Sequence, residues 1–98
     1  MSASILVIED EADIRRFVRQ ALEAEGYQVH ESADGRRGVL DAGTRRPDLI
    51  IVDLGLPDID GTDVIREVRS FSQLPIVVLS ARDNETDKIA ALDAGADD

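Results

Sequence analysis

The stretch Leu49-Ile50-Ile51-Val52-Asp53 decides the fold of this chain. Its four apolar residues run without alternation and three of them are β-branched, which is typical of a strand buried on both faces of a parallel sheet. The runs Ile5–Ile8 and Ile76–Leu79 have the same character, whereas Gln28–Glu31 alternates with polar residues and suits an edge strand. The sequence therefore predicts a sheet of parallel strands.

The segments between these predicted strands have apolar residues at the spacing of an α-helix. The first helix carries one apolar stripe and ends at Gly26; the stripe consists of Ile14, Phe17, Val18, Ala21 and Leu22. Two more helices are predicted, one over residues 62–70 and one that ends at Gly95. The segment 36–44 is predicted to be a short or loosely held helix, because Gly38 and Gly43 lower its helix propensity. We expect the aromatic residues Phe17, Tyr27 and Phe71 to serve packing.

The predicted order of elements is β-α-β-α-β-α-β-α. Right-handed crossovers between parallel strands turn this order into a doubly wound α/β domain with helices on both faces of the sheet. The pattern stops after a helix, with Asp97-Asp98 following it. We therefore expect residues 1–98 to form one domain that is incomplete at its C-terminal end, where a closing strand and helix are missing.

Composition narrows the classes of function. The chain has 98 residues, of which 43% are hydrophobic and 33% charged, as in one small globular domain. Its formal net charge of −10 disfavours nucleic acid and membrane surfaces as partners and favours cations. Cysteine is absent, and the apolar runs are far shorter than the roughly 20 residues that span a bilayer. We expect a cytoplasmic protein.

Acidic or hydroxyl side chains stand directly after three of the predicted strands. Glu9-Asp10 follows the first run, Asp53 follows the third, and Ser80 follows the fourth. Ligands of open α/β sheets bind beyond the carboxyl ends of the strands, so these groups are expected at one edge. Close carboxylates need a counterion, and oxygen ligands without His or Cys favour Mg²⁺, with Mn²⁺ also possible.

Asp53 is the candidate nucleophile at this edge. Magnesium is usually held by one or two carboxylates, which leaves an acid free to attack a phosphoryl group and form an acyl phosphate. The loop that follows is fixed by Pro57, Asp58 and Gly61, and it is expected to aim the Gly55 carbonyl at the metal. The residues expected to surround the metal at this edge are Glu9, Asp10, Asp53 and Gly55.

Simpler roles exist for each of these residues taken alone. Asp10 at a strand-to-helix junction is more often a helix cap, and Ser80 is more often a hydrogen-bonded loop hydroxyl. Asp53 is harder to explain in this way, because an acid at the end of so apolar a run loses solvation without compensation. Their convergence on one edge favours a functional site.

These residues resemble the receiver (CheY-like) domain of bacterial two-component response regulators. Glu9-Asp10 matches the acidic metal-binding pair of the family, Asp53 its phosphoacceptor, Gly55 its carbonyl ligand and Ser80 its switch hydroxyl. The resemblance covers residues 4–98 and implies the flavodoxin-like strand order 2-1-3-4-5, here without the fifth strand and helix. It also implies Mg²⁺-dependent phosphorylation of Asp53 by a sensor histidine kinase, followed by an inward turn of Ser80.

Longer stretches, residues 47–58, 79–82 and 87–98, resemble the OmpR/PhoB-type transcription factors that control potassium-uptake operons. This resemblance implies a homodimer through the face of the fourth helix and a separate DNA-binding domain outside this chain. The lysine that precedes the fifth helix in the family has no match, because Lys88 belongs to the predicted fourth helix.

Two other classes of function compete with a phosphoacceptor. A phosphatase would share the aspartyl nucleophile, but the position two residues beyond Asp53, where a general acid would stand, is Gly55. We therefore do not expect an enzyme. A receiver-like interaction module that is not phosphorylated, or a fragment without signalling activity, would keep the fold without the chemistry.

Overall fold

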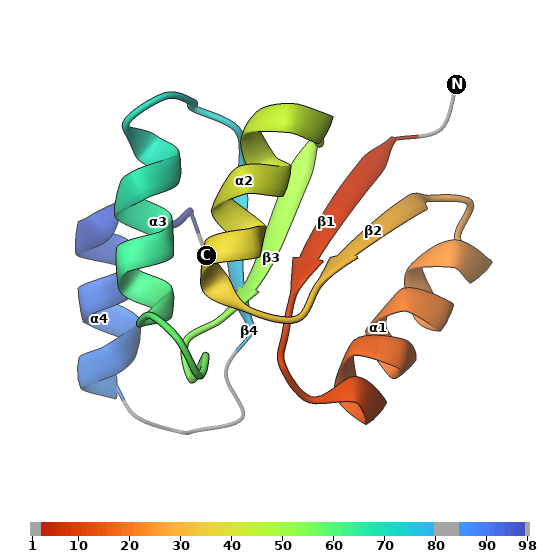
Figure 1. The fold of residues 1–98 in the computed structure, drawn as a ribbon, viewed down its shortest axis with the longest axis horizontal. Helices are drawn as coiled ribbons and strands as arrows, with labels where there is room; N and C mark the ends of the chain where they lie inside the picture. The colour runs from red at the N-terminus through yellow and green to blue at the C-terminus, as the bar shows by residue number, and fades with distance from the viewer. Residues whose placement is uncertain (1–2, 80–84, 98) are drawn as a thin grey trace.

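The structure is a computed structural model that describes residues 3–79 and 85–97. Over these residues, strands and helices alternate along the chain (Figure 1). The elements are β1 (Ser4–Ile8), α1 (Ala12–Ala24), β2 (Gln28–Ser32), α2 (Gly35–Arg45), β3 (Leu49–Asp53), α3 (Gly61–Arg69), β4 (Ile76–Leu79) and α4 (Glu85–Ala94). The predicted order of elements is confirmed. Among the helices of the described residues, none has the length and hydrophobicity of a membrane span.

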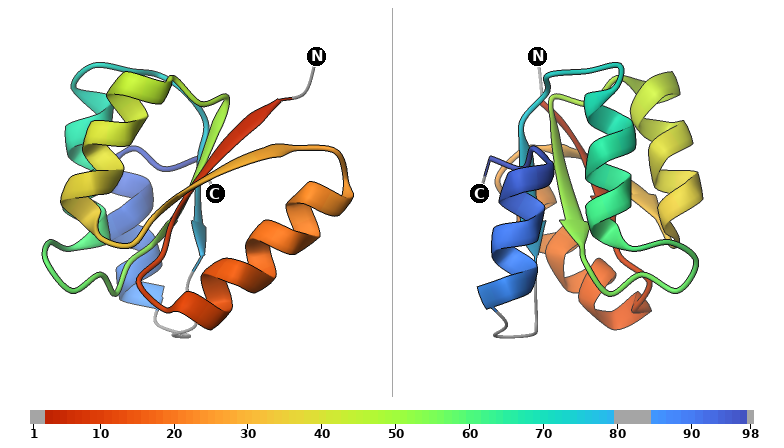
Figure 2. Two further views of the ribbon diagram at one scale, coloured as in Figure 1. Left: turned by 45° about the vertical axis from the view of Figure 1, so that its right-hand side comes forward. Right: turned by 90° about the vertical axis from the view of Figure 1, so that its left-hand side faces the viewer.

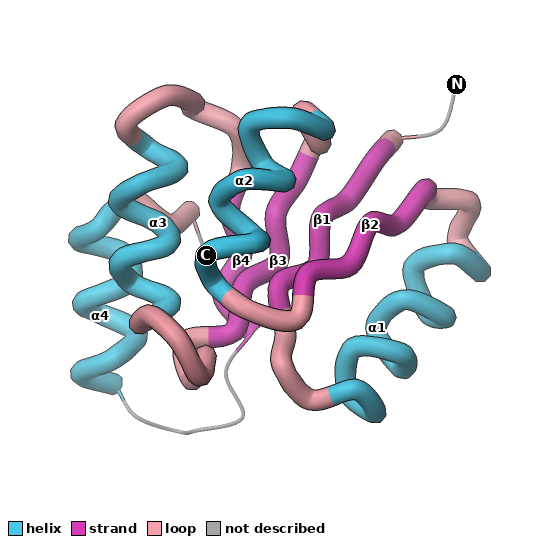
Figure 3. Tube along the Cα trace, viewed as in Figure 1, coloured by secondary structure: helices cyan, strands magenta, loops and turns pink. Residues whose placement is uncertain are grey.

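The strands form one parallel sheet in the order β2-β1-β3-β4. Ile8 lies opposite Ser32 on one side and Val52 on the other, and Asp53 lies opposite Leu79. The carboxyl ends of all the strands therefore meet at one edge, which we call the carboxyl edge (Figure 3). The order agrees with the first four positions of the predicted 2-1-3-4-5 sheet, and the described residues contain no fifth strand.

Helices cover the two faces of the sheet (Figure 2), and an apolar layer lies on each face. Leu6, Ile8, Ile50 and Val52 point toward α2, α3 and α4 and form the larger core. On the other face, Ile5 and Val7 pack with Val18 and Leu22 of α1. Helices on both faces explain why the central strands read as continuous apolar runs.

Helix α2 is longer and better packed than predicted. It covers 11 residues, Asp34 caps it by accepting a hydrogen bond from the Arg37 amide, and Gly38 is buried. A Cβ atom at Gly38 would lie 2.5 Å from Ile8 Cδ1, so this glycine allows the helix to approach β1 closely. Tertiary packing thus outweighs the low helix propensity that led to the prediction of a loosely held segment.

The aromatic residues contribute less to packing than expected. Phe17 is 73% exposed, Tyr27 41% and Phe71 51%. The predicted stripe on α1 does face the sheet through Val18 and Leu22, but Phe17 lies outside the core. The helical spacing predicts which face of α1 points toward the sheet. It does not show which residues of that face are buried against the sheet.

The Arg69 side chain joins three elements at the other end of the sheet. Its Nη1 donates to the Leu74 carbonyl at 2.6 Å, and its Nε donates to the Gly95 carbonyl at 2.8 Å. Its Nη2 lies 2.9 Å from Asp97 Oδ2, which also accepts from the Ile76 amide. The end of α3, the start of β4 and the segment after α4 are therefore tied together.

Candidate functional site

Glu9, Asp10 and Asp53 come together at the carboxyl edge, as predicted. One carboxylate oxygen from each lies within 4.8 Å of the others. Glu9 and Asp10 follow β1, and Asp53 is the last residue of β3, so adjacent strands bring the acids together although they are distant in sequence. Glu9 is buried, Asp53 is partly exposed and Asp10 is exposed, which gives a cluster with one side open to solvent.

The β1–α1 loop is held by backbone hydrogen bonds and by Arg15. The Glu9 amide donates to the Ser32 carbonyl of β2 at 3.0 Å. Arg15 Nη1 of α1 donates to the Glu9 carbonyl at 2.8 Å. The N-cap residue of α1 is Glu11, so Asp10 does not hold the capping position that was its simpler explanation.

Asp53 is oriented by the loop that follows it. The Gly55 amide donates to Asp53 Oδ1 at 3.2 Å, and the Gly61 amide donates to the Leu54 carbonyl at 3.2 Å. A Cβ atom at Gly61 would lie 2.5 Å from the Asp53 carbonyl oxygen. Glycine is therefore required at position 61 for α3 to begin against the end of β3.

The cluster is electrostatically unfavourable when all three acids are ionised. Burial, followed by the hydrogen bond with Asp53 and the negative charge of Asp53, raises the pKa of Glu9 from 4.5 to about 8. None of the ion pairs formed by the described residues includes a member of the cluster. The cluster thus requires either a proton on Glu9 or a cation between the acids.

Asp58 connects the β3–α3 loop to another helix. Its Oδ1 accepts from the Gly35 amide at 2.7 Å and its Oδ2 accepts from the Arg36 amide at 2.8 Å, both in the first turn of α2. Desolvation opposes ionisation of Asp58, but these hydrogen bonds outweigh it and lower the pKa of the carboxyl below its usual value. The loop beside Asp53 is therefore fastened to α2.

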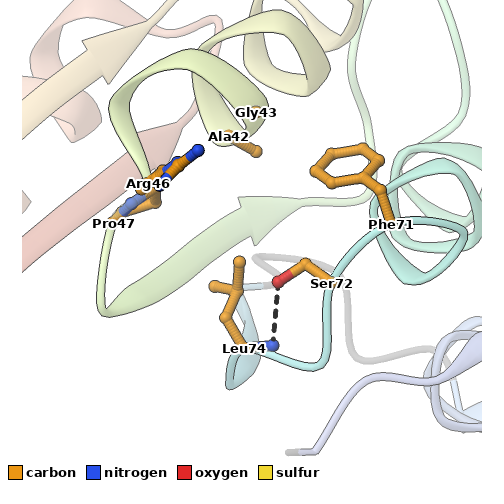
Figure 4. A pocket seen from close by; sticks show the side chains of 7 residues that line it. All are labelled: Ala42, Gly43, Arg46, Pro47, Phe71, Ser72 and Leu74. Carbon is orange, nitrogen blue, oxygen red and sulfur yellow. Dashed lines mark hydrogen bonds between the residues drawn. The ribbon is translucent and has the colours of Figure 1, made fainter.

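A separate hollow of about 440 Å³ lies near the opposite edge of the sheet (Figure 4). Its walls include the exposed ring of Phe71, the side chain of Leu74 and the left-handed residue Arg46 that follows α2. Pro47 and Leu74 precede β3 and β4, whereas the acids lie at or just after the carboxyl ends of their strands. The hollow is thus distinct from the acidic cluster.

The family of the chain follows from its match to known sequences. The Response regulator receiver domain family matches residues 5–98, a range that contains all three acids. This chain belongs to that family.

Relatives of this receiver domain include transcriptional regulators. It is 60% identical over 95 residues to the KDP operon transcriptional regulatory protein KdpE of Escherichia coli K12, covering 97% of this chain and 42% of that protein. It is 47% identical over 94 residues to the transcriptional regulatory protein KdpE of Mycobacterium tuberculosis CDC 1551, covering 96% and 42%. The chain therefore spans about two fifths of the length of these relatives.

Solved receiver structures have the same fold. A CheY-like response regulator receiver domain protein from Methanospirillum hungatei superposes with a TM-score of 0.93 at 26% identity, covering 99% of this chain and 78% of that one. The predicted resemblance to the receiver family is confirmed by the family match and by this fold.

Some predicted features of the receiver site cannot be placed. Ser80 lies outside the described residues. Gly55 lies beside Asp53 through its amide, and its carbonyl remains a predicted ligand. Lys88 lies within α4, as expected.

Two site residues have roles that the sequence did not reveal. The sequence indicates no role for Arg15, and it marks Asp58 as one of the residues that fix the loop after Asp53. Both act through hydrogen bonds to backbone groups of other segments. Such bonds have no pattern of residue types that sequence reasoning could detect.

Proposed function

We propose that this receiver domain accepts a phosphoryl group on Asp53 from a sensor histidine kinase of the KdpD kind, with Mg²⁺ as cofactor. The observation that carries the proposal is the convergence of three carboxylates within 4.8 Å at the carboxyl edge of a parallel sheet. Asp53 is partly exposed and lies at the end of a buried strand, so a phosphoryl donor can approach it from solvent.

The acidic cluster fits a hard divalent cation. The three acids supply only oxygen donors, and burial of Glu9 makes the uncompensated cluster costly. Asp10, Asp53 and the Gly55 carbonyl would hold Mg²⁺, with Glu9 assisting through water. When bound, the ion would neutralise negative charge on the incoming phosphoryl oxygens.

The chemical step is a displacement at phosphorus. One Asp53 carboxylate oxygen forms a bond to phosphorus while the bond from phosphorus to the imidazole nitrogen of the donor breaks. The electron pair of the broken bond stays on the imidazole, which takes up a proton from water. The product is an acyl phosphate on Asp53, and the Gly55 amide keeps the carboxylate oriented through its bond to Oδ1.

The consequence of phosphorylation is a change of assembly. Ser80 would then turn toward the new phosphoryl oxygens, and repacking of α4 would favour a homodimer through the face of that helix. The relatives named KdpE are transcriptional regulators and are longer than this chain. We infer that the dimer controls transcription of a potassium-uptake operon through a separate DNA-binding domain, in the cytoplasm.

Labelling with a small acyl-phosphate donor tests the proposal. Asp53→Asn should abolish Mg²⁺-dependent incorporation of phosphate, since the amide lacks a nucleophilic carboxylate oxygen. Asp63→Asn is the matched control, because it removes the same charge from an exposed site on α3. Undiminished labelling of Asp53→Asn would overturn the assignment. Absence of Mg²⁺ binding by calorimetry at millimolar concentration would favour an interaction module instead.

A further inference from the structure

The loop that connects β3 to α3 has one hydrogen-bonded anchor on α2. That anchor is the carboxylate of Asp58, whose two oxygens each accept a short hydrogen bond from an amide of α2. The amides belong to Gly35 and Arg36, which are 23 and 22 residues away in sequence. Hydrogen bonds from backbone amides to an ionised acceptor are stronger than those between neutral groups, and amides at a helix N-terminus favour negative charge.

The fit between the loop and α2 depends on a missing side chain. A Cβ atom at Gly35 would lie 2.5 Å from Ile59 Cγ1, the residue next to Asp58. Gly35 is buried, and Ile59 packs against the larger core. The start of α2 and the middle of the loop are therefore in close contact, and the bonds of Asp58 fix their relative position.

The same loop determines how Asp53 is presented. At its beginning, the Gly55 amide donates to Asp53 Oδ1, and at its end Gly61 touches the Asp53 carbonyl group. Residues 54–60 thus run from the Asp53 carboxylate to the start of α3, with Asp58 fastened between them. A shift of the loop at Asp58 would move Gly55 relative to the carboxylate that it orients.

We propose that Asp58 is a positioning residue for the phosphorylation of Asp53, acting by fastening the β3–α3 loop to the first turn of α2. The inference rests on the proposed function and adds a residue that makes no contact with the phosphoryl group. Reaction rates are sensitive to such positioning, because a misplacement of about 1 Å can lower a rate by about 100-fold.

Asp34 provides a matched control for Asp58. It caps the same helix, since its Oδ1 accepts from the Arg37 amide at 2.8 Å, but it belongs to the β2–α2 connection. Replacing either residue by alanine removes a carboxylate from the first turn of α2 and weakens the helix. Only the Asp58 substitution also removes the hydrogen bonds between the β3–α3 loop and α2.

The test compares Asp58→Ala with Asp34→Ala in the full-length protein, using an acyl-phosphate donor at a temperature well below both unfolding midpoints. We expect Asp58→Ala to slow labelling of Asp53 by about tenfold or more, and Asp34→Ala to change it by less than about twofold. Asp58→Asn should fall between, since its amide oxygen can accept only part of the bonding. Hydrogen exchange of the Gly55 amide, which donates to Asp53 Oδ1, should accelerate in Asp58→Ala alone.

Two outcomes separate this inference from the function on which it rests. Equal labelling rates and equal exchange in the Asp58→Ala and Asp34→Ala proteins would overturn the positioning role while leaving phosphorylation intact. Absence of Asp53-dependent labelling in the wild-type protein would instead overturn the proposed function. In that case faster exchange of the Gly55 amide in Asp58→Ala would still establish the structural anchor but not a role in the reaction.

Discussion

Glu9 and Asp41 are both buried acids, yet their surroundings are opposite. Asp41 of α2 is 4% exposed, and its Oδ2 accepts a hydrogen bond from Ser32 Oγ at 2.8 Å. Arg37 and Arg45 approach its Oδ1 at 3.3 Å and 3.8 Å. Glu9 is 3% exposed, and its close charged neighbours are the carboxylates of Asp10 and Asp53.

The difference shows how a structural acid can be distinguished from a functional one. Burial of a charge is tolerated where cations and donors compensate it, as around Asp41. Around Glu9 the chain supplies additional negative charge, and the pKa of Glu9 rises to about 8. The negative charge of Glu9 has to be compensated by a proton or by a bound cation. The negative charge of Asp41 is already compensated by groups of the fold.

The largest loss of stability caused by a substitution is expected from removing the compensated acid, Asp41. Asp41→Ala leaves the buried Ser32 hydroxyl without its acceptor and removes the partner of two arginines, so we expect a loss of about 2–3 kcal/mol in the free energy of unfolding. Urea denaturation measures this loss. Asp63→Ala, which breaks an exposed pair with Arg66, should cost less than about 0.5 kcal/mol. Similar losses in the two variants would contradict the role assigned to Asp41.

The next prediction concerns the pH dependence of stability. Removing the Glu9 carboxylate should raise the free energy of unfolding, whereas removing that of Asp41 lowers it. The pKa of Glu9 is about 8 in the fold and 4.5 in the unfolded chain, so the folded state holds a proton that the unfolded chain has lost over this interval. This residue therefore lowers stability as pH rises from about 4.5 to about 8, by at most about 1.4 kcal/mol per pH unit.

Glu9→Gln removes this contribution. Its stability should match the wild type near pH 4, where Glu9 is protonated in both the folded and the unfolded chain, and should exceed it increasingly toward pH 8. Chemical denaturation across this range in the absence of divalent cations measures the difference. A constant difference between the two proteins at every pH would contradict the raised pKa.

A smaller effect is expected from Mg²⁺. Binding to the folded state should raise the free energy of unfolding by about 1.4 kcal/mol at a concentration roughly ten times the dissociation constant. Asp10→Asn should reduce this increment, and Asp41→Asn should leave it unchanged. Thermal unfolding with and without Mg²⁺ provides the measurement, and an equal reduction in both variants would remove the distinction between the two sites.

The smallest effect is expected at Ser32. Ser32→Ala removes one hydrogen-bond donor from Asp41, but both arginines remain, so the loss should be about 1 kcal/mol. A double-mutant cycle with Asp41→Ala measures the coupling between the two residues. Additive losses would show that the buried hydrogen bond contributes little.

The fold could be predicted because its signals are local. The apolar runs at Ile5, Leu49 and Ile76 mark the central strands, and Gly26 and Gly95 end their helices with positive φ angles of 90° and 121°. The convergence of Glu9, Asp10 and Asp53 also followed from topology, since parallel strands end at one edge.

Features that depend on contacts between distant segments could not be predicted. Gly38 has a low helix propensity, but the absence of a side chain at this position allows α2 to pack closely against Ile8. The hydrogen bonds from α2 to Asp58 join residues more than twenty positions apart. Neither segment has a sequence pattern that indicates contact with the other. Phe17 has the spacing of a core residue although it is largely exposed.

The bonds of Arg69 constrain how α4 can rearrange. They hold Gly95 and Asp97, which follow α4, to the end of α3 and the start of β4. The opposite end of α4, at Glu85, lies on the side of the carboxyl edge (Figure 1). We therefore expect the Arg69 bonds to restrain the Gly95 end of α4, so that any rearrangement of this helix is larger toward Glu85.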